Sequence, residues 1–183
     1  MKSPLRLFVF LFLTITACYG NKPNNEPDAS QLTTSIEFKI CENKKLIIKL
    51  PSIIRTYVDY DYSDYNSDIN AWNRYTFIYN QQDTATAQIV TLVRGKDSCN
   101  NDETKTYDHL SKLVYMYHGT PGQLKNETVD LKDTKLYIVY FNSGFLACGC
   151  YNNKSFRIEL SNIKDSHLCQ SIAKSIVLQN GYR

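Results

Sequence analysis

Cysteine is the residue type whose spacing in this 183-residue chain most directly suggests chemistry. Cys148-Gly149-Cys150 has the spacing of a redox or metal-binding pair, but the chain holds no second closely spaced Cys/His pair to complete a zinc site. The surrounding sequence is strand-like, so the two cysteines share one face and each can pair across a sheet. We therefore predict structural disulfides or buried thiols among five cysteines: Cys41, Cys99, Cys148, Cys150 and Cys169.

The three histidines form no arrangement typical of catalysis or metal binding. His109 and His118 are nine residues apart, which is not the spacing of a two-histidine metal site. Ser166 directly precedes His167, and two adjacent residues on a helix do not face each other as a catalytic pair would. The chain also lacks a glycine-rich phosphate loop and a Gly-x-Ser-x-Gly nucleophile turn. These patterns predict a protein that is not an enzyme, with no catalytic residue, no metal and no cofactor. A cysteine-dependent enzyme using Cys148 or Cys150 is the alternative.

Residues 57–68 alternate tyrosine with acidic residues, which suits neither a core strand nor a plain linker. A calcium loop is not predicted, because glycine is absent at its sixth place and Asn70 stands at its twelfth. Exposed tyrosines among acids are typical of a loop that binds a basic protein partner. The alternative is a solvated loop whose tyrosines fold back onto the sheet. The predicted partner-binding residues are Tyr57, Asp59, Tyr60, Asp61, Tyr62, Asp64 and Tyr65.

The first eighteen residues have the order of a secretory signal. Lys2 and Arg6 precede an apolar run over residues 7–13, which is too short for a membrane span. The segment resembles a bacterial lipoprotein signal, with Ile15 and Ala17 at the aliphatic and small positions before Cys18. The resemblance implies that Cys18 is acylated, for example with palmitate, and anchors the chain to a bacterial membrane facing the periplasm. The alternative is an ordinary signal cut after Gly20, which would give a secreted soluble protein.

The remaining chain of about 165 residues suffices for one domain with a proper core. The formal charge of the full sequence is +3 and falls to +1 once Lys2 and Arg6 are removed with the signal, so nucleic acid is not an expected partner. We predict a signal peptide over residues 1–17, a flexible tether over 18–34 and one binding domain over 35–183. The tether is polar, with two prolines and no apolar period.

Apolar periodicity predicts an opening hairpin, then further strands and two helices. We expect strands at 36–40, 46–50, 74–80, 85–94, 135–141, 145–151 and 155–160, helices at 103–118 and 165–178, and a loop over 52–71. Thr104 or Asn101 is expected to cap the first helix, which Gly119 stops. Ser161 or Asn162 is expected to cap the second.

This order predicts an α+β fold, an antiparallel β-sheet covered by helices in a single domain. The chain resembles the PsbP-like fold over residues 36–178. The resemblance is carried by the hairpin closing on Lys49-Leu50-Pro51, the paired strands RYTFIYN and TAQIVTLV, and the ending SIAKSIVL after KSFRIEL. Bacterial lipoproteins are among the members of that family.

Export, a lipid tether and an acidic aromatic loop together predict a membrane-anchored lipoprotein that binds another protein. Its most concrete form is an immunity protein that neutralises a cognate toxin, such as one delivered by type VI secretion. The alternative is an envelope scaffold or assembly lipoprotein without a toxin partner. Because folds do not fix function, both are hypotheses by analogy.

Overall fold

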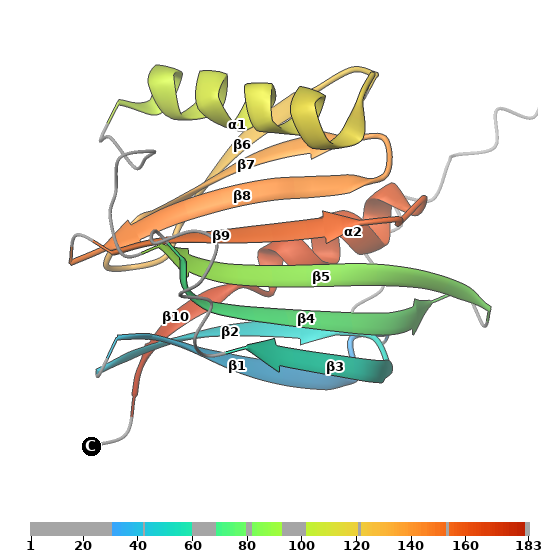
Figure 1. Cartoon of the computed structure of the whole chain (residues 1–183), viewed down its shortest axis with the longest axis horizontal. Coiled ribbons are helices and arrows are strands. Elements are labelled where there is room, and N and C mark those ends of the chain that lie inside the picture. The colour runs from blue at the N-terminus through green and yellow to red at the C-terminus, as the bar shows by residue number, and fades with distance from the viewer. Residues whose placement is uncertain are drawn as a thin grey trace, which may run out of the picture.

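The computed structural model describes residues 31–41, 43–59, 69–79, 82–92, 102–120, 122–152 and 154–181. Within these ranges the chain forms ten strands and two helices (Figure 1). Their bounds are β1 Thr34–Cys41, β2 Lys44–Leu50, β3 Ile53–Asp59, β4 Ile69–Tyr79, β5 Asp83–Leu92, α1 Glu103–His118, β6 Lys125–Asp130, β7 Lys135–Phe141, β8 Gly144–Tyr151, β9 Lys154–Ser161, α2 Ser166–Lys174 and β10 Val177–Asn180.

The predicted α+β fold, an antiparallel sheet covered by helices, is wrong. The strands form two antiparallel sheets, a small one in the order β1-β2-β10 and a large one in the order β3-β4-β5-β9-β8-β7-β6. Figure 1 shows α1 along only one end of the large sheet, over β6, β7 and β8. The molecule is therefore mostly β, and sheet packs against sheet where helices were expected.

Three strands lie where the sequence predicted something else. The expected loop over 52–71 contains β3 and the start of β4, and β6 forms in a segment to which no strand was assigned. The second helix ends at Lys174, so β10 occupies residues that were predicted to be helical. In each case polar or ambiguous local sequence gives way to pairing with a neighbouring strand.

The opening hairpin is confirmed, with Ile36 opposite Ile48 and Phe38 opposite Leu46. These alternate residues of β1 and β2 are buried, so the small sheet turns one apolar face to the large sheet. The main core fills the space between the two sheets and also takes in α2. Its largest fully buried side chains include Phe77, Phe145 and Phe156.

Aspartates directly before the helices cap both of them. The side chain of Asp102 accepts a hydrogen bond from Lys105 N at 3.2 Å, and that of Asp165 accepts from His167 N and Leu168 N at 2.9 and 3.0 Å. The predicted caps at Thr104 or Asn101 and at Ser161 or Asn162 are therefore wrong. The aspartate carboxylates satisfy amide donors that the first turn leaves without partners.

A partly buried ion pair connects the small sheet to the β6–β7 turn. Nζ of Lys44 donates to the carboxylate of Asp133 and lies 5.2 Å from the ring centroid of Tyr151. The Lys44 side chain is 9% exposed and that of Asp133 is 34% exposed. This hydrogen bond raises the pKa of Lys44 above its ordinary 10.5 and lowers the pKa of Asp133 below its ordinary 3.8.

The stabilisation by this pair is expected to disappear in acid and in strong base. The Asp133 contribution is complete above pH 3.8 and is lost as the pH falls through the lowered pKa, because the folded carboxyl then protonates. The Lys44 contribution is complete below pH 10.5 and is lost as the pH rises through the raised pKa. Thermal melts of wild type and Asp133→Asn across pH measure both effects.

Glu37→Gln is the matched control for Asp133→Asn. Glu37 pairs with Lys45 at 2.8 Å, but its side chain is 57% exposed, so solvent screens the pair. We expect the melting-temperature gap between wild type and Asp133→Asn to close at acid pH, and Glu37→Gln to stay near wild type throughout. A gap that is constant from neutral to strongly acid pH would contradict the assignment.

Candidate protein-binding surface

The large sheet has one face turned away from the small sheet, and α1 covers only part of it. Leu110 and Val114 of α1 pack on Tyr137, Val139 and Phe141 of β7 and on Leu146 and Cys148 of β8. Beyond the helix, this outer face continues over β9, β5, β4 and β3. Its side chains there include exposed Arg55, Tyr57 and Arg74 and half-buried Trp72 and Gln88.

A β-bulge in β3 places two of these residues on the outer face. Ile53 lies opposite Phe77, a core residue, whereas Arg55 lies opposite Thr76 on the outer face, with a register shift between them. Directly opposed residues share a face, so the extra residue Ile54 reverses the alternation. Tyr57 then lies opposite Arg74 and also faces outward.

Five side chains surround a shallow hollow of ≈ 510 Å³ on these two strands. We call this group the Arg–aromatic patch: Arg55, Tyr57, Trp72, Arg74 and Thr76. The rings of Tyr57 and Trp72 are tilted by 59° with centroids 5.4 Å apart, a favourable geometry for an aromatic pair. Tyr57 nevertheless stays 51% exposed. The patch thus presents preformed aromatic area with a cationic residue on each strand.

The opposite boundary of the open face is the C-terminal end of α1. His118 stacks on Phe141 with ring centroids 4.4 Å apart, and its Nε2 lies 3.5 Å from a carboxylate oxygen of Glu159 on β9. Cζ of Arg157 lies 6.0 Å from the ring centroid of Tyr117. These contacts fix the end of α1 against β9 and border the open face on that side.

The predicted binding loop is only partly within the described residues. Tyr57 belongs to β3, and Asp59 ends that strand. Tyr60, Asp61, Tyr62, Asp64 and Tyr65 lie outside the described residues, so their role stays a prediction. The structure adds Arg55, Trp72 and Arg74, which the sequence reasoning missed. The alternating pattern of Arg55 and Tyr57, and of Trp72 and Arg74, was the available signal.

No protein-family model, curated protein or solved structure matches this chain. Of the helices in the described ranges, neither has the length and apolar character needed to cross a bilayer.

None of the cysteines within the described ranges lines the patch. Cys41, Cys148 and Cys169 carry free thiols, and those of Cys148 and Cys169 are buried, so these three form no disulfide with one another and two of them match the predicted alternative of buried thiols. Cys150 lies in β8 opposite Ser155 of β9, and Cys99 and Cys18 lie outside the described residues. Burial raises the pKa of the Cys169 thiol to about 12, so this thiol is protonated at neutral pH. Among the described residues, no three Cys, His, Asp or Glu side chains gather to hold a metal.

The chemistry of the Arg–aromatic patch is that of recognition. Tyrosine, tryptophan and arginine are the side chains most enriched where protein interfaces concentrate their binding energy. A guanidinium binds a carboxylate through two parallel hydrogen bonds, which gives orientation as well as attraction. The described surface therefore favours a partner with acidic groups, in contrast to the basic partner predicted from the loop.

Proposed function

We propose that this protein is a lipid-anchored, periplasm-facing binding protein whose Arg–aromatic patch holds another protein. Its most concrete form is an immunity protein that neutralises a secreted antibacterial toxin. The observation that carries the proposal is the contact between exposed Tyr57 and half-buried Trp72, flanked by Arg55 and Arg74 on the outer face of the large sheet. We infer binding without catalysis, since the patch is made of arginine, aromatic and threonine side chains, which suit contact with another protein.

The backbone beneath the patch is suited to a rigid contact surface. β4 lies between β3 and β5 and pairs along its length with β5. On the face opposite the patch, Tyr75 and Phe77 of β4 are buried in the core. A preformed surface of this kind loses little conformational entropy on binding, so its aromatic contacts contribute more fully to affinity.

Truncation of Tyr57 or Trp72 is expected to weaken partner binding by about 2 kcal/mol, or roughly 30-fold in Kd, which is the magnitude of an interface hot spot. The partner to use is the protein encoded beside this one in the producing genome. Tyr57→Ala and Trp72→Ala are compared with wild type by calorimetry and by survival of cells that export this neighbouring protein to the periplasm.

Tyr115→Ala is the matched control for Tyr57→Ala. Tyr115 is 54% exposed and Tyr57 is 51% exposed, but Tyr115 lies on α1 outside the patch. Survival and affinity should fall for the patch variants and hold for Tyr115→Ala. Tight binding without protection from killing would favour the scaffold alternative. Equal affinity for all variants would rule out the patch as the contact surface.

The lipid anchor has its own prediction. Cys18→Ser is expected to abolish incorporation of a radioactive fatty acid and to release the chain from membranes or leave its signal uncut. The reason is that thioether-linked lipid has no other attachment point directly after Ala17 and the apolar run. Absence of label on wild type would disprove lipidation and leave the soluble, secreted form, with binding by the patch unaffected.

A further inference from the structure

The small sheet has an outward face whose composition differs from that of the Arg–aromatic patch. Residues Ser35, Glu37 and Lys39 of β1 alternate with buried ones and face outward, as do Lys45, Ile47 and Lys49 of β2 and Val177 and Gln179 of β10. Glu37 is the single acidic residue in these three strands, and Lys45 pairs with it at 2.8 Å. Lys39 and Lys49 are left as exposed positive charges.

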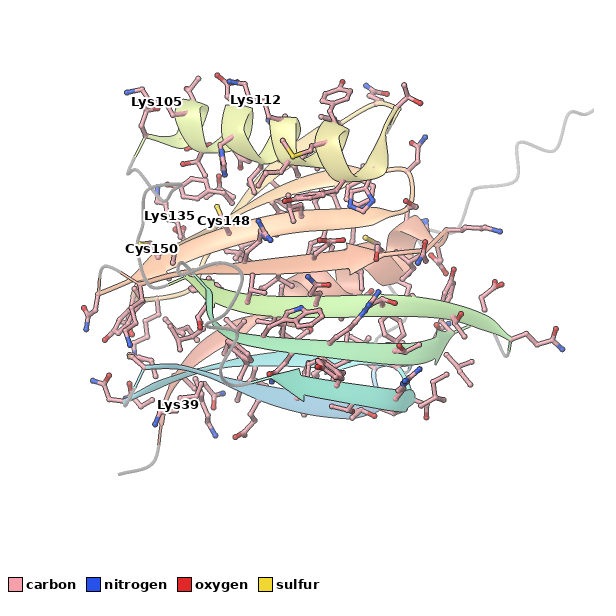
Figure 2. The ribbon with its side chains drawn as sticks, viewed as in Figure 1. Lys39, Lys105, Lys112, Lys135, Cys148 and Cys150 are labelled. Atoms are coloured by element: carbon pink, nitrogen blue, oxygen red, sulfur yellow. The ribbon has the colours of Figure 1, made fainter. Side chains whose placement is uncertain are left out.

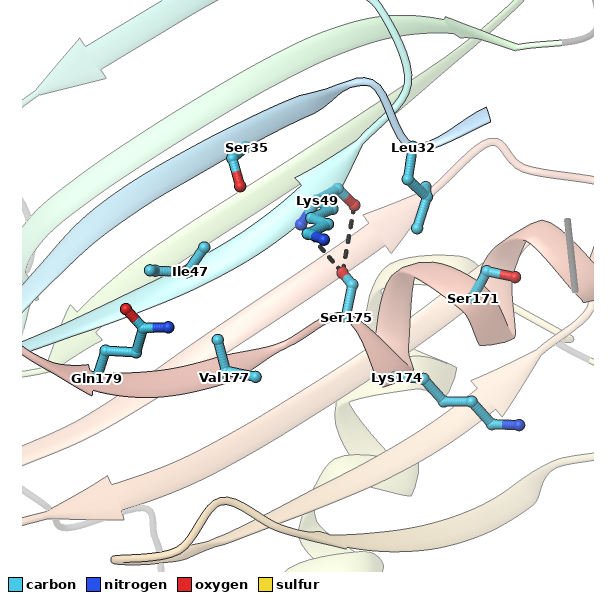
Figure 3. A pocket seen from close by; sticks show the side chains of 9 residues that line it. All are labelled: Leu32, Ser35, Ile47, Lys49, Ser171, Lys174, Ser175, Val177 and Gln179. Carbon is cyan, nitrogen blue, oxygen red and sulfur yellow. Dashed lines mark hydrogen bonds between the residues drawn. The ribbon is translucent and has the colours of Figure 1, made fainter. Parts of the chain in front are cut away.

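A groove of ≈ 630 Å³ lies between this face and the end of α2. Figure 3 shows Ile47 and Val177 next to each other on its floor and Leu32 at one end, with Lys49 held near Ser175. Ser175 Oγ accepts a hydrogen bond from Lys49 N at 3.0 Å, which fixes β2 to the turn after α2. Lys174 also lines the groove, and Val177 is 39% exposed.

These residues combine an apolar strip with lysines around it. We call Lys39, Lys49 and Lys174, together with Ile47 and Val177, the lysine face. Lysine is depleted from the cores of protein interfaces, whereas its compact ammonium charge on a long apolar stem suits a phosphate layer above an apolar phase. The composition therefore favours a lipid surface over a protein partner.

The chain enters the domain at this face. Leu32 lines the groove and packs against the main core, and β1 begins two residues later. Cys18 stands fourteen residues before Leu32 in the sequence. A chain of that length spans at most roughly 50 Å, so an anchor at Cys18 keeps the groove side within that distance of the membrane.

We propose that the lysine face docks on a membrane that contains anionic lipids, with Lys39, Lys49 and Lys174 at headgroup phosphates and Ile47 and Val177 at the interface. This orientation rests on the lipid anchor proposed above, but the docking itself is measured without the anchor. The Arg–aromatic patch lies on the outer face of the other sheet, so it remains available to a partner while the lysine face is docked.

The test uses a chain that begins at position 18 with Cys18→Ser, which lacks lipid and signal but keeps every described element. Its binding to phosphatidylcholine vesicles with and without phosphatidylglycerol is measured by flotation at low and high salt. Each lysine near an anionic surface contributes a factor of roughly five, so the triple variant Lys39→Glu, Lys49→Glu, Lys174→Glu, which also adds repulsion, should lose at least about 100-fold in affinity.

A triple variant with the same change in charge is the control: Lys105→Glu, Lys112→Glu, Lys135→Glu. Figure 2 places Lys105 and Lys112 on α1, on the opposite side of the molecule from Lys39. All six lysines are exposed, and circular dichroism melts check that both triple variants keep the fold. Docking is supported if wild-type binding to anionic vesicles weakens at high salt and only the first triple variant loses this binding.

Two outcomes would overturn the proposal. One is equal binding of wild type to neutral and anionic vesicles, and the other is an equal loss in both triple variants. Neither outcome touches the partner-binding function, which is measured with the Tyr57 and Trp72 variants. Conversely, docking on vesicles would stand even if the neighbouring protein proved not to bind.

Discussion

Replacement of Phe156 by alanine is expected to lower the free energy of unfolding by about 4 kcal/mol, within the range found for buried Phe→Ala changes. Phe156 has no exposed surface and lies opposite Gly149 in the β8–β9 pair. Its ring covers the glycine so closely that an added Cβ at Gly149 would meet the ring at 2.4 Å. The truncation therefore opens a cavity in the main core.

A double-mutant cycle with Gly149→Ala tests this packing directly. In wild type the new methyl group collides with the ring of Phe156, so Gly149→Ala should be destabilising. In the Phe156→Ala background the same methyl group enters vacated space, and its cost should largely disappear. Urea denaturation gives both values. A loss below 1 kcal/mol for Phe156→Ala, or additive effects of the two changes, would show that the ring does not fill this space.

Gly144→Ala is expected to cost about 3 kcal/mol, the upper part of the range for overpacking. Gly144 begins β8 with φ at +157°, and an added Cβ would lie 1.8 Å from the carbonyl oxygen of Leu160. That oxygen belongs to the backbone of β9, so no side-chain rotation relieves the collision. To make room for the methyl group, β8 and β9 must move apart at the end of their pairing that holds Gly144 and Leu160.

Gly119→Ala is the control that measures the cost of backbone strain without a collision. Gly119 follows α1 with φ at +71°, and an added Cβ there would meet no atom within 4 Å. Its cost should be that of conformational strain, about 1 to 2 kcal/mol. Urea denaturation should rank Gly144→Ala well below Gly119→Ala in stability. The reverse order would mean that β9 moves aside easily at this position.

Strongly alternating segments were predictable from the sequence. Ile36, Phe38 and Ile40 alternate with polar residues, and the strand they imply is present as part of β1. Helix α1 was predicted from the spacing of Leu110 and Val114, and both residues are buried against the large sheet. In these elements one face is apolar along its whole length, so local pattern and tertiary burial agree.

The edge strands and the end of α2 were not predictable in the same way. β3 and β6 are edge strands with polar residues, and such sequences are hard to tell from loops. Ile176 continues the helical spacing of Leu168 and Ile172, which favoured a longer helix. The helix nevertheless stops, and the following residues pair with β2. Contacts with a strand far away in the sequence decided the outcome.

The candidate site was only partly predictable because it spans two strands. Tyr57 stood out among tyrosines and acids, but its neighbour Trp72 lies fifteen positions later. Their contact depends on the register of β3 on β4, which the bulge at Ile54 sets. Neither the bulge nor the register has a signature in the local sequence, so the arginines beside the two rings were missed.

The pairing of β10 with β2 has a consequence for the order in which the chain can fold. Val177 lies opposite Ile47, so the last strand pairs with one near the start of the domain, and Gly181 N donates to Asn43 O at 2.9 Å. During synthesis, the edge of β2 that β10 later covers stays open until residues 177–180 have been made. An exposed strand edge is a template for aggregation. The nascent protein should therefore depend on a chaperone until its C-terminal residues arrive.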